Sequence, residues 1–395
     1  MKMRYLICAA LLLAACGQAA NEAIDVIADK SLDDIATVES SQGKLDMTTE
    51  TPVAAKELPL PAFPNYPAAK TMLSADDNGV IYYPIKSPYD FSRVLSGYDD
   101  LETHTGKATL VMPKGASADK PVPAMVILHG SGGIKEGREM EYAALFAKNG
   151  IAGLVVDYYE PRGVTPDTVY QMKTMIATEV DVMSDAYSAL KTLGTHPAIN
   201  ASKIGVTGYS YGGMATRYVM DDRLKNIMAP DAAPFALHMD IYGPCHQTLG
   251  HADTTGAPYL AIHGDADNSV DPVLCQAVYK DLEAAGTKVE SHVMPGAGHA
   301  WENASPKQEF TEGSFVRGCK FSYDPKTGAF LVDGKAGRFQ PTLDMTRPQR
   351  AMVRAGLGEL AGSCVGQGYT VGSDPATDKK SKAIQLEFMK RVFGL

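Results

Sequence analysis

The chain has 395 residues and a formal net charge of −9, from 37 lysines and arginines and 46 aspartates and glutamates. The charges are spread along the chain without a basic block, which argues against nucleic acid as a partner. The length allows one large domain with additional segments and an extensive core.

The N-terminus is typical of an export signal. Lys2 and Arg4 precede an apolar run, Tyr5–Ala15, which is too short to span a membrane as a mature helix. The sequence Leu13-Ala14-Ala15-Cys16-Gly17 is similar to a bacterial lipobox, which implies cleavage before Cys16 and lipidation of its sulfur. An ordinary secretory signal with an incidental cysteine is the alternative. We therefore expect a lipoprotein signal peptide over residues 1–15 and a lipid-anchored protein of the bacterial cell envelope, facing the periplasm or the cell surface.

Residues 16–70 are expected to form a flexible tether. They are rich in Ala, Ser, Thr, Asp, Glu and Pro with little periodic apolarity. Such a segment buries too little surface to offset its ordering entropy, although its proline-rich end should be extended and fairly stiff. A folded domain is expected over residues 71–395.

Four cysteines remain outside the signal and the lipid site, an even number that suggests two disulfides in an oxidising compartment. Three pairings are possible. We favour Cys245–Cys275 and Cys319–Cys364, because each pair brackets a local segment. A zinc site is the alternative, but no close Cys-x-x-Cys pair is present, so no metal is expected.

Three early strands are expected, the last of them buried on both faces of a largely parallel sheet: Gly79–Pro84, Lys107–Met112 and Ala124–Leu128. The third strand ends in the glycine-rich loop His129-Gly130-Ser131-Gly132-Gly133. Open α/β sheets bind ligands at this edge, and in serine hydrolases such a loop supplies an N–H group to the oxyanion. Ser131 is our candidate donor and Gly132 its rival. A plain tight turn is the alternative.

A helix and another buried strand should follow: Glu139–Lys148 and Ile151–Val156. Arg162, in the loop after that strand, has two interpretations: it orients an acidic substrate group, or it forms a salt bridge with Asp157 or Glu160. Thr168–Leu193 is predicted to be one long helix with a methionine-rich stripe packed on the sheet, without a cofactor.

The sequence Lys203–Ala215 is predicted to be a strand, a sharp turn and a helix with Ser210 at the apex. A serine hydroxyl is a poor nucleophile unless it is exposed where a base can reach it. Gly208 and Gly212 allow strand and helix to pass closely, and the N–H of Tyr211 can point at an oxyanion. Ser210 is therefore the candidate nucleophile. A solvated serine in a glycine-rich turn is the alternative.

Two later strands, Phe235–Tyr242 and Pro258–His263, have little sequence between them, so no large lid is expected there. Asp267, on the loop after the second strand, is the candidate acid. Asp265 and Asp271 are the other choices, although they are more typical of turn or helix-cap residues.

A helix and a strand are expected next: Val273–Ala285 and Lys288–Met294. They lead into the loop Pro295–Trp301, where His299 is the candidate general base. His263 lies inside a strand and is interpreted as structural. Ser210, Asp267 and His299 occur in the chain order of an α/β-hydrolase triad.

Residues 302–375 are expected to be an insertion that lies over or beside the site, before a last helix. Within the insertion, Lys320–Lys335 is expected to form a hairpin turned at Asp324–Gly328, and Pro348–Leu360 a helix. The last helix is expected over Lys379–Phe393.

The motif Gly208–Gly213, Asp267, His299 and the loop at residues 129–133 together resemble the dienelactone hydrolase family of α/β-hydrolases. The resemblance covers roughly Thr105–His299 and the tail Cys364–Phe393. It implies an α/β-hydrolase fold, with a mostly parallel central sheet and helices on both faces, and maps nucleophile, acid and base to Ser210, Asp267 and His299. The family's namesake uses a cysteine nucleophile on small lactones, whereas this chain has a serine.

We therefore expect a carboxylester hydrolase that cleaves ester or lactone bonds of small to medium substrates through an acyl-enzyme, without a metal or organic cofactor. One alternative is an exported serine peptidase or amidase of the same fold, which usually carries a large propeller or cap domain. The other is a non-catalytic binding protein on a hydrolase scaffold, which should have lost part of the triad. The oligomeric state stays open.

Overall fold

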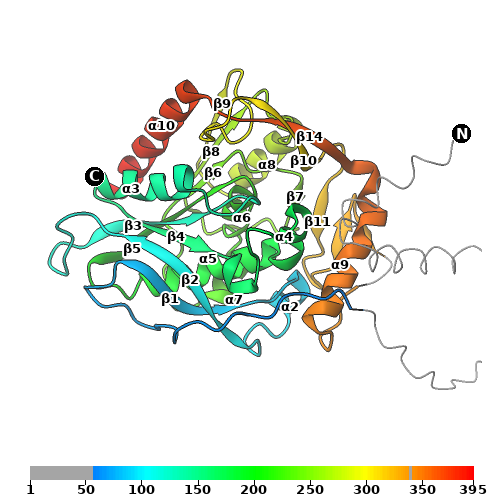
Figure 1. Ribbon diagram of the computed structural model, residues 1–395, viewed down its shortest axis with the longest axis horizontal. Coiled ribbons are helices and arrows are strands. Elements are labelled where there is room, and N and C mark those ends of the chain that lie inside the picture. The colour runs from blue at the N-terminus through cyan, green and yellow to red at the C-terminus, as the bar shows by residue number, and fades with distance from the viewer. Residues whose placement is uncertain (1–56, 338–339) are drawn as a thin grey trace, which may run out of the picture.

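The computed structural model describes residues 57–337 and 340–395, so the expected signal peptide, Cys16 and most of the expected tether lie outside the described residues. One sheet of eight strands, in the order β1-β2-β4-β3-β5-β6-β8-β9, organises the fold (Figure 1). Strand β2 runs antiparallel to both its neighbours, and all pairs from β4 to β9 are parallel. The strands of this sheet are β1 Gly79–Lys86, β2 Thr103–Val111, β3 Val122–Leu128, β4 Ala152–Asp157, β5 Ile199–Tyr209, β6 His238–Ile241, β8 Tyr259–Gly264 and β9 Val289–Met294. The expected mostly parallel sheet is confirmed.

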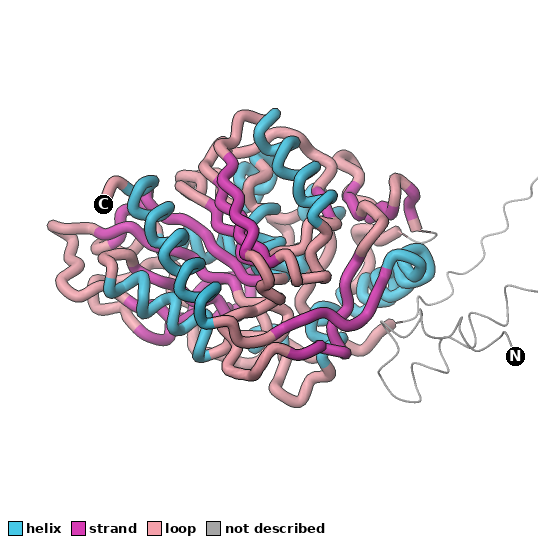
Figure 2. Tube along the Cα trace, turned by 90° about the horizontal axis from the view of Figure 1, so that it is seen from above, coloured by secondary structure: helices cyan, strands magenta, loops and turns pink. Residues whose placement is uncertain are grey.

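Strand β3 shows why the central strands read as continuous apolar runs. Val126 and Leu128 pack on one side of the sheet, in the same cluster as residues of α5 and α6. Met125 and Ile127 pack on the other side, with residues of α3 and α10. Helices therefore cover both faces, as Figure 2 shows from above, and successive side chains of the strand are buried from Pro123 to its end.

The helices are α2 Phe91–Leu95, α3 Glu141–Lys148, α4 Tyr170–Ile176, α5 Glu179–Leu193, α6 Tyr211–Tyr218, α7 Asp222–Met228, α8 Pro272–Ala284, α9 Arg347–Ala361 and α10 Pro375–Phe393. The described part of the chain contains no helix with both the length and the apolar character needed to cross a membrane.

The prediction of one helix over Thr168–Leu193 was wrong, because the chain breaks between α4 and α5. Thr178 is extended, and its hydroxyl accepts a hydrogen bond from the N–H of Asp181, whose carboxylate in turn accepts from the N–H of Thr178. This reciprocal capping box starts a new helix. The break places Glu179, the first residue of α5, at the edge of a cavity.

The insertion forms one side of the molecule, drawn in yellow to orange-red in Figure 1. Its first strand, β10 (Gln308–Val316), pairs antiparallel with its last, β14 (Val365–Val371). The expected hairpin is present as β11 (Phe321–Tyr323) and β12 (Phe330–Val332), extended by β13 (Lys335–Ala336). Strand β11 also pairs with β7 (Gln247–Thr248) of the core, so backbone hydrogen bonds join the insertion to the rest of the domain.

Both expected disulfides are present. Cys319–Cys364 closes a loop within the insertion, from the start of the hairpin to the turn after α9. Cys245–Cys275 joins the segment after β6 to helix α8.

Residues 57–70, the described end of the expected tether, have no helix or strand but lie against the domain. The Phe63 ring stacks on His104 with ring centroids 3.7 Å apart. The Tyr66 hydroxyl donates to Glu160 at 2.8 Å, and the N–H of Lys70 donates to the carbonyl of Tyr82 at 2.8 Å. This part of the chain is therefore attached to the domain, which extends before residue 71.

Candidate active site

Ser210 lies at the apex of the turn between β5 and α6. Its φ of 55° and ψ of −114° lie in a region that is strained for residues other than glycine. A Cβ on Gly208 would collide with the backbone of Gly212, and a Cβ on Gly212 would collide with the carbonyl groups of Leu128 and His129. The two glycines thus allow strand and helix to approach closely enough to expose the serine at the top of the sheet.

The structure brings Ser210, His299 and Asp267 together in one line of hydrogen bonds. The distance from Ser210 Oγ to His299 Nε2 is 2.8 Å, and His299 Nδ1 lies 2.6 Å from Asp267 Oδ2. When Nδ1–H donates to the carboxylate, Nε2 is left as the acceptor for the serine hydroxyl. Both His299 and Asp267 are buried, which fixes the imidazole orientation.

The other acids and the other histidine considered for the triad have separate contacts. Asp265 accepts a hydrogen bond from the N–H of Gly296 at 2.6 Å, and Asp271 caps helix α8. His263 is buried at the end of β8.

Ser269 also belongs to the site, although the sequence analysis did not predict it. Its hydroxyl donates to Asp267 Oδ1 at 2.5 Å and lies 3.2 Å from His299 Nδ1. Its N–H also donates to Asp267 Oδ1, at 3.0 Å. A serine two residues after an aspartate on a turn is a signal for such a contact, because Asx turns place these groups together.

Strand β14, the last strand of the insertion, is hydrogen-bonded to the loops that carry Asp267 and His299. The N–H of His299 donates to the carbonyl of Thr370 at 2.7 Å. The amide of Asn268, next to Asp267, donates to the carbonyl of Gly368 at 3.1 Å and accepts from the N–H of Thr370 at 3.2 Å. The insertion therefore supports the site directly, through contacts between residues 71 to 102 positions apart.

The expected oxyanion loop lies directly against Ser210. A Cβ added to Gly130 would be 3.4 Å from the Cβ of Ser210. The Ser131 hydroxyl is 2.6 Å from the Tyr170 hydroxyl, and the Ser131 carbonyl accepts from Tyr159 at 3.0 Å. Ser131 and Tyr211 both line the same cavity as Ser210. The choice between Ser131 and Gly132 as donor stays a prediction.

A buried ion pair lies behind this loop. Arg138 Nε donates to Glu139 Oε1 at 2.6 Å, and Glu139 Oε2 accepts from the N–H of Lys135 at 2.8 Å. An Nη of Arg138 lies 3.4 Å from the carbonyl of Gly133. Burial alone would lower the pKa of Arg138, but the charge and hydrogen bond of Glu139 together with Tyr242 and the charge of Glu302 outweigh it, and the pKa is raised. The pair therefore restrains the loop at residues 129–133 through the contact with the carbonyl of Gly133.

Both interpretations of Arg162 were wrong. Its guanidinium is fully buried and donates two parallel hydrogen bonds to Asp185, at 2.7 and 2.9 Å. Asp157 instead accepts from the N–H groups of Tyr159 and Glu160. The short turn at Glu160–Arg162 directs the side chain inward toward α5, so it neither reaches a substrate nor shapes the loop through Asp157 or Glu160.

A cavity of about 310 Å³ opens beside Ser210, between the core and the insertion. Core residues on its wall include Met175, Tyr211, Met214 and Gln247, and nearly half of the lining comes from β10, β11, β12, α9 and β14. The insertion lies beside the site, as expected.

One cluster of metal-ligand types occurs among the described residues, formed by Asp221, Asp222 and His251. Asp221 is paired with Arg223 at 2.6 Å, and His251 lies 2.8 Å from Asp222. These groups have partners already, and the cluster is separate from the cavity at Ser210.

Comparison with known proteins gives a family match and two relatives. The model of the Dienelactone hydrolase family matches residues 107–329. A protein of Bradyrhizobium sp. named for 2-oxo-3-(5-oxofuran-2-ylidene)propanoate lactonase activity is 24% identical over 194 residues, which cover 46% of this chain and 73% of that protein. A protein of Methylorubrum extorquens named for carboxymethylenebutenolidase activity is 23% identical over 240 residues, covering 59% and 77%.

Solved structures give similar matches. A dienelactone hydrolase structure from Klebsiella pneumoniae has a TM-score of 0.39 at 18% identity, and covers 57% of this chain and 89% of that chain. Esterase 2 of Thermogutta terrifontis in its apo form has a TM-score of 0.41 at 18% identity, covering 50% and 80%.

Proposed function

Because this chain belongs to the dienelactone hydrolase family and is a carboxylester-type hydrolase, we propose that it cleaves ester or lactone bonds of small to medium substrates through an acyl-enzyme on Ser210. The observation that carries the proposal is the line of hydrogen bonds from Ser210 through His299 to Asp267, at the mouth of a cavity.

The geometry supports a two-step reaction. His299 Nε2 removes the hydroxyl proton as Ser210 Oγ attacks the carbonyl carbon, and Asp267 holds the imidazole and stabilises its charged form. The N–H groups of Tyr211 and Ser131 stabilise the oxyanion in this proposal. The proton on His299 passes to the leaving alcohol. In the second step His299 activates water, which releases the acid and restores Ser210.

The test is the variant Ser210→Ala, assayed on p-nitrophenyl esters. We expect turnover to fall by several orders of magnitude, of the size seen when a triad serine is removed. The matched control is Ser202→Ala, since Ser202 is an exposed serine on β5, the strand that leads to Ser210. A fluorophosphonate should label the wild type and the control at Ser210 and leave Ser210→Ala unlabelled. A folded Ser210→Ala protein that keeps a tenth of the activity would contradict the proposal.

We also propose that the mature protein is anchored at the bacterial cell envelope by a lipid on Cys16. The lipobox-like sequence and the even set of paired cysteines support it, since disulfides persist in oxidising compartments. Labelled palmitate should enter the wild type and not Cys16→Ala, which should appear in the soluble fraction. Equal labelling of the two proteins would exclude this site.

A further inference from the structure

The cavity beside Ser210 has a charged pair on its wall. Arg354, from helix α9 of the insertion, donates to both carboxylate oxygens of Glu179, at 3.1 and 2.7 Å. The Glu179 side chain is 2% exposed and that of Arg354 is 24% exposed. The cation is therefore the partner that faces the space where a substrate would lie.

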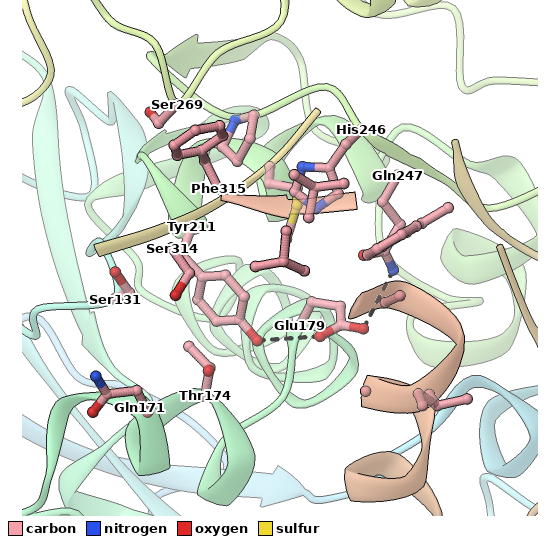
Figure 3. A pocket seen from close by; sticks show the side chains of 18 of the residues that line it. Ser131, Gln171, Thr174, Glu179, Tyr211, His246, Gln247, Ser269, Ser314 and Phe315 are labelled. Atoms are coloured by element: carbon pink, nitrogen blue, oxygen red, sulfur yellow. Dashed lines mark hydrogen bonds between the residues drawn. The ribbon is translucent and has the colours of Figure 1, made fainter. Parts of the chain in front are cut away.

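Three further side chains donate hydrogen bonds to the carboxylate of this pair. Glu179 Oε1 accepts from Tyr323 at 2.6 Å and from Gln247 at 3.3 Å, and Oε2 accepts from Tyr211 at 3.2 Å. Figure 3 shows Tyr211 and Gln247 converging on this carboxylate. Burial alone would raise the pKa of Glu179, but the charge and hydrogen bonds of Arg354, together with the hydrogen bond from Tyr323 and a backbone hydrogen bond, outweigh it and hold the pKa at about 2. At neutral pH both groups are charged, and their charges cancel.

The rest of the wall offers no counter-ion. Among the lining residues, all of which the structure describes, Arg354 is the only lysine or arginine and Glu179 the only acid. Burial lowers the pKa of His246 to about 4, so this histidine is neutral at pH 7. Much of the remaining lining is apolar, including Phe315 and Leu357. A charged substrate would lose its hydration here without gaining a partner of opposite charge.

We propose that this cavity selects uncharged esters with an apolar acyl group, and that Glu179 determines this specificity by neutralising Arg354. This inference rests on the proposed function and names its substrate class. The cavity volume of about 310 Å³ lies at the small end of ligand pockets, which suits a single short acyl group beside the serine.

The test compares two substrates with acyl chains of equal length that differ in the group at the chain end: p-nitrophenyl hexanoate, which ends in a methyl group, and the mono-p-nitrophenyl ester of adipic acid, which ends in a carboxylate. We expect wild-type kcat/KM to favour the neutral ester by about 100-fold or more, a discrimination of about 3 kcal/mol. In Glu179→Gln the charge of Arg354 is no longer cancelled, so the preference should narrow by at least about tenfold through a gain on the anionic ester.

Two further variants, Arg354→Met and the double variant, complete a double-mutant cycle with Glu179→Gln. Arg354→Met leaves Glu179 uncompensated, so the preference against the anionic ester should widen, and p-nitrophenyl 6-(trimethylammonio)hexanoate should gain about tenfold. The double variant Glu179→Gln with Arg354→Met removes both charges and should return to the wild-type preference. If Glu179→Gln does not fold, the Arg354→Met result tests the same idea alone.

Equal rates of the wild type on the neutral and anionic esters would overturn the proposal. So would an unchanged preference in folded Glu179→Gln or Arg354→Met protein. Fluorophosphonate labelling separates this failure from a failure of the proposed function: a wild type that labels at Ser210 but lacks the preference contradicts only the specificity, whereas a wild type that does not label contradicts the serine mechanism.

Discussion

Ser269 connects the acid and the base of the site through one hydroxyl group. It donates to the Asp267 oxygen that does not face His299, and it lies within hydrogen-bonding distance of His299 Nδ1. The hydroxyl thus restricts rotation of the carboxylate and, through it, of the imidazole. Ser269 is a positioning residue for the proposed reaction.

We expect Ser269→Ala to lower kcat by about 10- to 150-fold, because a lost hydrogen bond to a charged group is worth about 1.5–3 kcal/mol. KM should change little, and the acid limb of the pH profile of kcat/KM should shift, since the environment of the imidazole changes. Ser269→Thr keeps a hydroxyl and should restore most of the rate. An unchanged pH profile in Ser269→Ala would show that the contact is only structural.

The residues of the site differ in how far the sequence could locate them. Ser210, Asp267 and His299 each follow a strand with glycines nearby, and parallel strands bring their carboxyl ends to one edge. The pair of Glu179 and Arg354 joins positions 175 residues apart in sequence. No local pattern links these two positions, so only the folded chain reveals their contact.

At the scale of elements, β14 is both the wall of the cavity and the support of the triad loops. It hydrogen-bonds to the His299 backbone and to the Asn268 side chain, and its Tyr369 ring packs edge-on to His299 at 5.1 Å between centroids. The Cys319–Cys364 disulfide lies immediately before this strand. The covalent link therefore limits how far β14 can move from the triad.

Removal of this disulfide should weaken catalysis as well as stability. The loop that it closes spans 45 residues, for which the chain-entropy account gives about 4 kcal/mol. In Cys319→Ser with Cys364→Ser we expect a lower kcat on neutral esters and faster amide hydrogen exchange in β10 and β14, while the core sheet exchanges as before. Faster exchange without any loss of kcat would show that β14 does not support the triad.

The elements were predictable where one local signal dominated. Continuous apolar runs gave the central strands, and the Asp-Pro and Gly turn signals gave the hairpin of the insertion. The prediction of one long helix was wrong because the apolar spacing continues across Thr178. At this residue the side-chain hydrogen bonds of the capping box outweigh the periodicity and start a new helix. The pairing of β10 with β14 could not be foreseen, since the two strands are separated by a hairpin and a helix.

At the scale of the whole molecule, the core and the insertion build the candidate site together. The core supplies the proposed nucleophile on a strained turn, and the insertion supplies Arg354, much of the cavity wall and the strand behind His299. The core was predictable from the sequence, because Ser210, Asp267 and His299 follow one another at the spacing of a strand–helix repeat. The role of the insertion depends on contacts between distant positions, which the sequence does not encode locally.

The stability of the whole fold should depend on pH through two fully buried histidines. Burial lowers the pKa of His129 to about 3 and that of His238 to about 4. Both values lie below the roughly 6.5 of an unfolded chain, so between about pH 6.5 and 4 the unfolded state binds more protons than the folded state. Their contribution to stability is therefore complete above pH 7 and is lost as the pH falls.

These two protons contribute a slope that approaches about 2.7 kcal/mol per pH unit in this window, in addition to the contributions of His246, whose pKa burial also lowers to about 4, and of any carboxylates. Urea midpoints measured at pH 7, 6, 5 and 4 should fall steeply below pH 6. The variant His238→Gln cannot take up a proton in the unfolded state, so it should lose about half of this slope, although Gln at a buried position lowers stability at pH 7. A parallel pH dependence of His238→Gln and wild type would show that His238 is not held neutral by burial.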